Sequence, residues 1–164
     1  MPICGFNTLL HLQKMKTMKT IFVLIIIAFA LNVSAQDIPV DVFQEQMIMV
    51  SENQDILKKY KVADEEGNPL FYINLGNYGK YHQVKPIENR NGELYLWNSE
   101  SIFFYDVPYS LELLSMEEMD DGMLFYKFNY FDGKKKYFIE VKFGNRYNKW
   151  ELVDVAITKV KAAY

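Results

Sequence analysis

His82 is the first residue to consider for chemistry, because only one other histidine, His11, occurs in the chain. An imidazole acts as a general base when a carboxylate orients it and a nucleophile lies within reach. The chain contains no Gly-x-Ser-x-Gly elbow and no other recognisable nucleophile context. A single histidine in a strand-like segment is more often a hydrogen-bonding residue at or near the surface. The sequence favours this role for His82.

Four carboxylates in the segment MEEMDDG form a second group that can do chemistry. Oxygen ligands of this kind bind Ca²⁺, which takes about six to eight of them. Their spacing lacks the Asp-x-Asn/Asp-x-Asn/Asp-Gly pattern of an EF-hand loop, so a solvated turn is the ordinary interpretation. Nothing singles out two carboxylates for glycoside hydrolysis either. The four residues are Glu117, Glu118, Asp120 and Asp121.

Tyrosine is the unusual component of the chain, with 12 residues, all of them beyond residue 35. A buried tyrosine needs a hydrogen-bond partner for its hydroxyl, whereas one in a wet pocket or an interface does not need a protein partner. We therefore expect a ligand or partner surface on the segments least certain to be core. An alternative is a tyrosine-rich sheet whose hydroxyls reach solvent. The candidate residues are Tyr72, Tyr81, His82, Tyr95, Trp97, Tyr105 and Tyr109.

The elements that position these residues follow an apolar leader. Eleven consecutive apolar residues run from Ile21 to Leu31, and as a helix they would span about 17 Å, against about 30 Å of bilayer hydrocarbon. Lys16 and Lys19 precede the run, and Val33-Ser34-Ala35 supplies the small residues that a signal peptidase reads. We expect residues 1–35 to be an upstream extension plus a cleaved secretory signal peptide. A retained anchor or a buried core helix is the alternative.

Cleavage would determine both the location and the chemistry of the protein. It would remove Cys4, the only cysteine, together with His11, so no disulfide, thiolate ligand or multi-histidine zinc site can form. No cysteine stands at the cleavage position to accept lipid. Translation can start at Met1, Met15 or Met18, since each leaves a complete signal. We expect no cofactor, no stable membrane span after cleavage, and a periplasmic or secreted protein.

The charge of the remaining chain argues against one class of partner. Three of the 18 basic residues lie in the leader, which leaves 15 against 21 acidic residues and a net charge of −6. Affinity for nucleic acid comes largely from cationic side chains that displace counterions. We therefore expect residues 36–164 to be a single domain that binds no nucleic acid.

The spacing of apolar residues predicts an α+β fold. Phe43, Met47 and Val50 recur at helical spacing, which predicts an amphipathic helix over 41–52, with Asp41 as N-cap, that continues or restarts to Tyr60. Beyond it, runs rich in Tyr, Phe, Ile and Val alternate with Gly, Asn, Asp and Pro, which predicts an antiparallel meander. The runs are LFYINL, YHQVKPI, ELYLW, SIFFYDV, YSLELLSM, MLFYKFNYF, KKYFIEVKF and WELVDVAITKV.

Asp132-Gly133 has the chemistry of a two-residue hairpin turn. With this turn, Phe131 faces Lys134 and Phe128 faces Tyr137, so that one face of the hairpin is nearly all apolar. Asp121-Gly122 can turn in the same way and would place Glu117 opposite Tyr126, although a longer loop is an equal alternative.

The last strand, Trp150 to Thr158, is apolar on both faces apart from Asp154, which predicts a central strand or one covered by the helix. Simple alternation places Trp150, Leu152 and Ala156 on one face and Val153, Val155 and Ile157 on the other.

The segment GKKKYFIEVKFGNRYNKWELVDVAITKV resembles the closing strands of NTF2-like (cystatin-like) domains, with their W-x-hydrophobic-x-D final strand at Trp150–Asp154. The resemblance implies an N-terminal helix packed on a curved sheet. It carries no functional residues, because the pocket residues of that family vary with its many functions. The strand-like runs between 70 and 107 depart from the family, which usually has a further helix there. A helix-capped β-barrel or sandwich therefore remains an alternative.

Two functions fit these observations. The first is the binding of a small apolar molecule or lipid in an aromatic-lined pocket between helix and sheet. The second is an interaction with an envelope protein, or with the protein itself, through an exposed edge strand or aromatic patch. An enzyme acting through His82 or a carboxylate is the third and least supported reading.

Overall fold

The computed structural model describes residues 38–60 and 62–160, which lie in one compact unit. The predicted leader, with Cys4 and His11, lies outside the described residues. Within the described ranges, no helix is long and apolar enough to cross a membrane.

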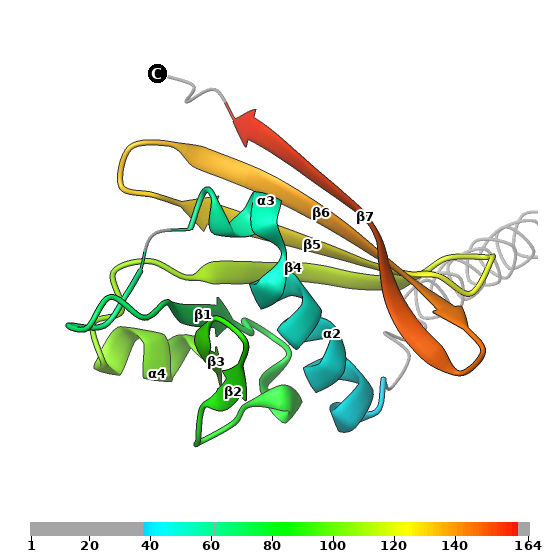
Figure 1. Ribbon diagram of the computed structural model, residues 1–164, viewed down its shortest axis with the longest axis horizontal. Coiled ribbons are helices and arrows are strands. Elements are labelled where there is room, and N and C mark those ends of the chain that lie inside the picture. Colours follow the sequence, from blue (N-terminus) through cyan, green and yellow to red (C-terminus); the bar gives the residue numbers. More distant parts are fainter. Residues whose placement is uncertain (1–37, 61, 161–164) are drawn as a thin grey trace, which may run out of the picture. The chain divides into compact units, whose positions relative to one another are not determined.

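Seven strands form one sheet that curls into a half-barrel around helix α2 (Figure 1). We call the face covered by α2 the inner face and the opposite one the outer face. The strand order is β2-β3-β1-β4-β5-β6-β7. The helices are α2 (Val40–Glu52), α3 (Gln54–Leu57) and α4 (Ser99–Phe104), and the strands are β1 (Leu70–Asn74), β2 (Ile87–Asn89), β3 (Gly92–Trp97), β4 (Leu111–Glu118), β5 (Leu124–Phe131), β6 (Lys136–Arg146) and β7 (Lys149–Val160).

The α+β class is confirmed, but the sheet is mixed rather than an antiparallel meander. Strand β1 lies between β3 and β4 and runs parallel to both. The other neighbouring pairs are antiparallel. Parallel neighbours need crossover connections, and here the segments before β3 and before β4 supply them.

The predicted amphipathic helix is confirmed as α2, and its apolar side chains Phe43, Met47 and Val50 are fully buried. Asp41 is not its N-cap, because the helix already begins at Val40, directly after Pro39. The chain then restarts as α3. The Asn53 side chain accepts hydrogen bonds from the backbone N–H groups of Asp55 (3.0 Å) and Ile56 (3.2 Å), which satisfies donors that the first helical turn leaves open.

The β5–β6 hairpin forms as predicted, but its register differs by two residues. The loop has four residues, and Phe131 pairs with Lys136 rather than with Lys134. Asp132 causes the longer loop, because its carboxylate accepts hydrogen bonds from the backbone N–H groups of Lys134 (2.9 Å) and Lys135 (2.7 Å). A shift of two residues keeps every side chain on its face. The predicted apolar face is therefore buried, with Leu124, Tyr126, Phe128 and Tyr130 on β5 and Tyr137, Ile139 and Val141 on β6.

The connection between β4 and β5 is a longer loop and not a two-residue turn at Asp121-Gly122. The Met119 carbonyl accepts a hydrogen bond from the Gly122 N–H (2.8 Å), and the Met119 N–H donates one to the Met123 carbonyl (2.8 Å). Tyr126 consequently pairs with Met116 and not with Glu117.

Of the two alternatives for the last strand, the central position was wrong, since β7 lies at the sheet edge, whereas the contact with the helix is present. Its inner face packs against α2. The predicted faces were wrong as well, because Lys142 pairs with Asp154 while Phe143 pairs with Leu152, which leaves Val153 as a bulge. The bulge shifts the alternation. Trp150, Leu152, Val155 and Ile157 all pack against the core, whereas Val153 and Ala156 are exposed.

Two segments read as strands are not strands. YHQVKPI begins with a 3₁₀ turn at Gly79–Tyr81, and only Ile87 at its end enters a strand. SIFFYDV forms helix α4 and the turn after it. The cause is Asn98, whose side chain accepts a hydrogen bond from the N–H of Ser101 (2.9 Å) and caps the helix.

Tyr60 joins β1 to β4 where these strands diverge. Their direct pairing is limited to Ile73 with Leu111 and Asn74 with Glu112. Just before these pairs, the Tyr60 hydroxyl accepts a hydrogen bond from the Tyr72 N–H (2.9 Å) and donates one to the Tyr109 carbonyl (3.2 Å). Burial raises the pKa of this hydroxyl far above its ordinary value, so it stays protonated and able to donate.

We predict that Tyr60→Phe lowers the free energy of unfolding by about 1–3 kcal/mol, because it leaves a backbone N–H and a carbonyl unsatisfied. Urea denaturation measures the effect. Tyr147→Phe is the matched control, since the Tyr147 side chain is fully exposed, and it should change stability by less than about 0.5 kcal/mol. Equal stability of the two variants would show that water replaces the Tyr60 hydroxyl without cost.

Candidate functional site

The space between α2 and the inner face is filled by side chains. Phe43 stacks on Tyr81 with ring centroids 4.0 Å apart, and Tyr126 packs on Phe43 at 6.1 Å. All three side chains are fully buried. The hollows described below lie elsewhere, so they give no support to a ligand pocket between helix and sheet.

Three predicted site residues have structural contacts. Tyr81 belongs to the core, and its hydroxyl donates to the Ile38 carbonyl (2.9 Å). His82 is half-buried, and its Nδ1 accepts a hydrogen bond from the Asn98 N–H (3.2 Å), next to the start of α4. The Tyr109 hydroxyl lies against Gly133 in the β5–β6 loop.

The other four, Tyr72, Tyr95, Trp97 and Tyr105, come together on the outer face, and we call them the aromatic cluster. The parallel register places Tyr72 beside Tyr95 and Asn74 beside Trp97. Ring centroids lie 4.8 Å apart for Tyr72–Tyr95, 5.0 Å for Tyr95–Trp97 and 4.8 Å for Trp97–Tyr105. The first three rings are half-buried because they cover one another.

The hydroxyl groups at this cluster are also held in place. Tyr95 donates to the Glu93 carboxylate at 2.5 Å. Burial, and then this hydrogen bond, raise the pKa of Tyr95. Burial and the negative charge of Glu93 raise the pKa of Tyr72 as well. Both side chains are therefore neutral at physiological pH and present apolar rings rather than charges.

Three aromatic residues project from the end of α4 beside this cluster, and we call them the α4 knob. Phe103 is 88% exposed, Phe104 79% and Tyr105 63%. Tyr105 belongs to both groups and links them, since it contacts Trp97 and Phe104. The sequence interpretation missed Phe103 and Phe104 because it read this segment as a strand. The signal that could have found them is Asn98, a preferred N-cap residue.

The surroundings of the α4 knob are acidic. The stretch 91–126 contains eight acidic residues and no lysine or arginine. Glu100 precedes the knob and Asp106 follows it, and neither carboxylate forms an ion pair with another residue of the described ranges. The outer-face site is thus aromatic with unpaired negative charge at its rim.

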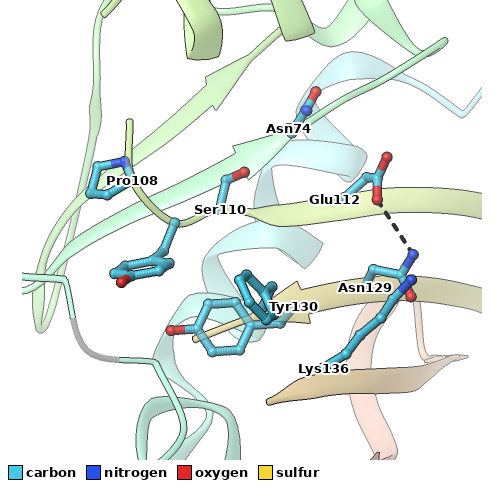
Figure 2. Close-up of a pocket in the computed structure, with 9 residues that line it drawn as sticks. Asn74, Pro108, Ser110, Glu112, Asn129, Tyr130 and Lys136 are labelled. Carbon is cyan, nitrogen blue, oxygen red and sulfur yellow. Dashed lines mark hydrogen bonds between the residues drawn. The ribbon is translucent and has the colours of Figure 1, made fainter. Parts of the chain in front are cut away.

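A hollow of about 410 Å³ with polar and apolar lining, which we call the mixed hollow, lies farther along the outer face (Figure 2). Glu112 accepts a hydrogen bond from Asn129 (3.3 Å), and the Lys136 side chain extends along Asn129 in Figure 2. Asn74 and Ser110 add polar groups, so the hollow combines both charge signs with hydrogen-bonding side chains. Its remaining lining consists of Pro108, Tyr109, Tyr130 and Phe131.

Two further hollows flank the sheet. One, of about 690 Å³, is lined mainly by polar groups near the start of α4, among them Asn98, Ser99 and Glu100. The other, of about 670 Å³, lies beside α3, and we call it the α3 hollow. It is lined by Gln54, Leu57, Tyr60, Val62, Ala63, Pro69, Arg90 and Asn91.

The described residues contain no group of three or more His, Cys, Asp or Glu side chains that would hold a metal ion. The predicted acidic segment lies at the exposed β4–β5 loop, where Glu117 is hydrogen-bonded to Lys127 (3.0 Å) and Ser115 (3.0 Å). These two hydrogen bonds lower the pKa of the Glu117 carboxyl. What the outer face offers is contact surface, in the form of rings, carboxylates and hollows.

One buried polar pair lies in the core, where the first function had placed a pocket. Tyr126 donates to Gln46 Oε1, while Gln46 Nε2 is buried with no partner among the described residues. If this pair is structural, Tyr126→Phe should lower the free energy of unfolding by about 1–3 kcal/mol, because it leaves the whole amide unsatisfied. The double variant Gln46→Met/Tyr126→Phe should recover most of that loss in urea denaturation. Additive losses in the double variant would contradict this.

A scan against protein-family models and searches of curated proteins and of solved structures found no match to this chain.

Proposed function

We propose that the protein is an exported interaction module that binds a protein partner through the α4 knob and the aromatic cluster. The single observation that carries this proposal is the exposure of Phe103 (88%) and Phe104 (79%) beside a continuous set of ring contacts. A contiguous exposed apolar patch on a soluble domain marks an interaction site. Aromatic residues also dominate the binding energy of protein interfaces.

The knob is held ready for binding. Asn98 caps α4 at one end. At the other end, the Val107 N–H donates to the Ile102 carbonyl (3.1 Å) and the Tyr105 ring packs on Trp97. A rigid projecting group loses little conformational entropy on binding. Protruding rings of this kind fit into a groove of the partner rather than around a small ligand.

The charges define the chemistry of the partner. Glu100 and Asp106 flank the knob, and neither forms an ion pair within the part of the chain that the structure describes. Complementary potentials favour and orient association. The partner surface is therefore an apolar groove with basic side chains at its rim.

The remaining expectations support this proposal from the sequence. The leader, with its short apolar run and its Val33-Ser34-Ala35 end, supports export to the periplasm or beyond. The likeness of Gly133–Val160 to NTF2-like domains is compatible with a helix on a curled sheet. The small-ligand function now rests on the mixed hollow of Figure 2, whose lining combines the charges of Glu112 and Lys136 with apolar groups.

The experiment places a photo-crosslinking amino acid at position 104 in the full chain in its own cells. We expect a crosslinked protein at position 104 that is not formed from position 147, which is even more exposed but lies far along the chain in the β6–β7 turn. With the purified partner, Phe103→Ser/Phe104→Ser should raise the dissociation constant at least about 30-fold, the effect of losing one hot spot.

Tyr147→Ser serves as the control and should bind like the wild type. Association should weaken with rising salt, because the rim charges are exposed to screening. Crosslinks of equal yield at positions 104 and 147, or an unchanged dissociation constant for the double serine variant, would refute the proposed function.

A further inference from the structure

The α3 hollow has the chemistry that the α4 knob requires. Part of its lining is apolar, formed by Leu57, Val62, Ala63 and Pro69, and Gln54 and Asn91 add polar groups. Its volume of about 670 Å³ is ample for an aromatic side chain. Arg90 stands in its lining and is exposed. A hollow with apolar lining residues and an exposed arginine, the features expected of the knob's partner, is thus present on this chain.

Charge supports the same pairing. Arg90 uses its backbone N–H to bind Glu52 (3.0 Å), but its guanidinium has no hydrogen bond or ion pair within 38–60 and 62–160. The carboxylates of Glu100 and Asp106 are equally unpaired. Arginine and carboxylate form strong, often bidentate, hydrogen bonds. The unpaired guanidinium of Arg90 can therefore pair with a carboxylate beside the knob.

The geometry makes the contact intermolecular. Tyr60, in the lining of the α3 hollow, packs on Phe71 and Tyr130, which belong to the inner face. Tyr105 of the knob packs on Trp97 on the outer face. Because the knob and the hollow lie on opposite faces of one sheet, a knob reaches only the hollow of another molecule.

We propose that the partner is a second copy of this chain, whose α3 hollow receives the α4 knob, with Arg90 against the flanking carboxylates. This inference rests on the proposed function and names the partner of the same surface. Such a contact joins two different patches, so it propagates from copy to copy unless the geometry closes it.

Sedimentation of the protein purified from its own cells tests the proposal. The wild type should associate reversibly between about 1 µM and 1 mM, the range of weak specific contacts. Two variants should each raise the dissociation constant of self-association at least ten-fold. They are the knob variant Phe103→Ser/Phe104→Ser and the hollow variant Ala63→Glu/Arg90→Glu. Both variants change exposed side chains, and matching urea midpoints will show that they fold.

Mixing the variants gives the decisive result. The knob variant keeps an intact hollow and the hollow variant keeps an intact knob, so an equimolar mixture should form a one-to-one complex with near wild-type affinity. Tyr147→Ser should associate like the wild type. A mixture that stays monomeric, or a wild type that stays monomeric at 1 mM, overturns the self-association. A crosslink from position 104 to a different protein would then leave the proposed function standing, whereas absence of any crosslink would refute both.

Discussion

The hydroxyl of Tyr60 holds the sheet together at its weakest seam, and the arrangement of the outer face depends on it. Strand β1 is parallel to both neighbours and shares only two residue pairs with β4. The hydroxyl extends this short ladder by one bridged position, from the Tyr72 N–H to the Tyr109 carbonyl. The same contact fixes Tyr72, whose ring starts the aromatic cluster, and Tyr109, which lines the mixed hollow.

The two faces of the sheet carry different groups of side chains. The inner face buries a continuous core under α2, including Phe71 and Ile73 of β1. Alternation then sends Tyr72 outward, while the parallel pairing brings Tyr95 and Trp97 next to it. The buried core and the aromatic cluster thus lie on opposite sides of the same strands. Substitutions in the α4 knob can for this reason change recognition without disturbing the core.

The sequence allowed the elements with strong periodicity to be predicted. The α2 helix, the faces of β5 and β6 and the existence of β7 follow from the spacing of apolar residues. Register was beyond reach where a side chain altered the backbone, as Asp132 does by capping its own loop. The bulge at Val153 likewise changes which side chains of β7 face inward. It arises from the pairing with β6, whose residues lie about ten positions away in the sequence.

The candidate site was predicted in part for a related reason. Tyr72, Tyr95, Trp97 and Tyr105 were identified because tyrosine excess signals rings with a use outside the core, and the structure brings these four together. Tyr81 was selected by the same criterion but lies in the core, since its hydroxyl finds the Ile38 carbonyl. Phe103 and Phe104 look like strand residues by composition. A single capping side chain, that of Asn98, overrides this local preference.

The position of β7 has a further consequence for the behaviour of the protein at high concentration. A twelve-residue strand at a sheet edge is a template on which other chains can polymerise. Here the bulge at Val153 interrupts the flat run of backbone, and exposed charges at Lys149, Glu151, Asp154 and Lys159 are spread along it. The bulge and the charges disfavour the addition of further strands to this edge. The protein can therefore expose aromatic rings on one surface while its edge strand β7 resists amyloid-like stacking.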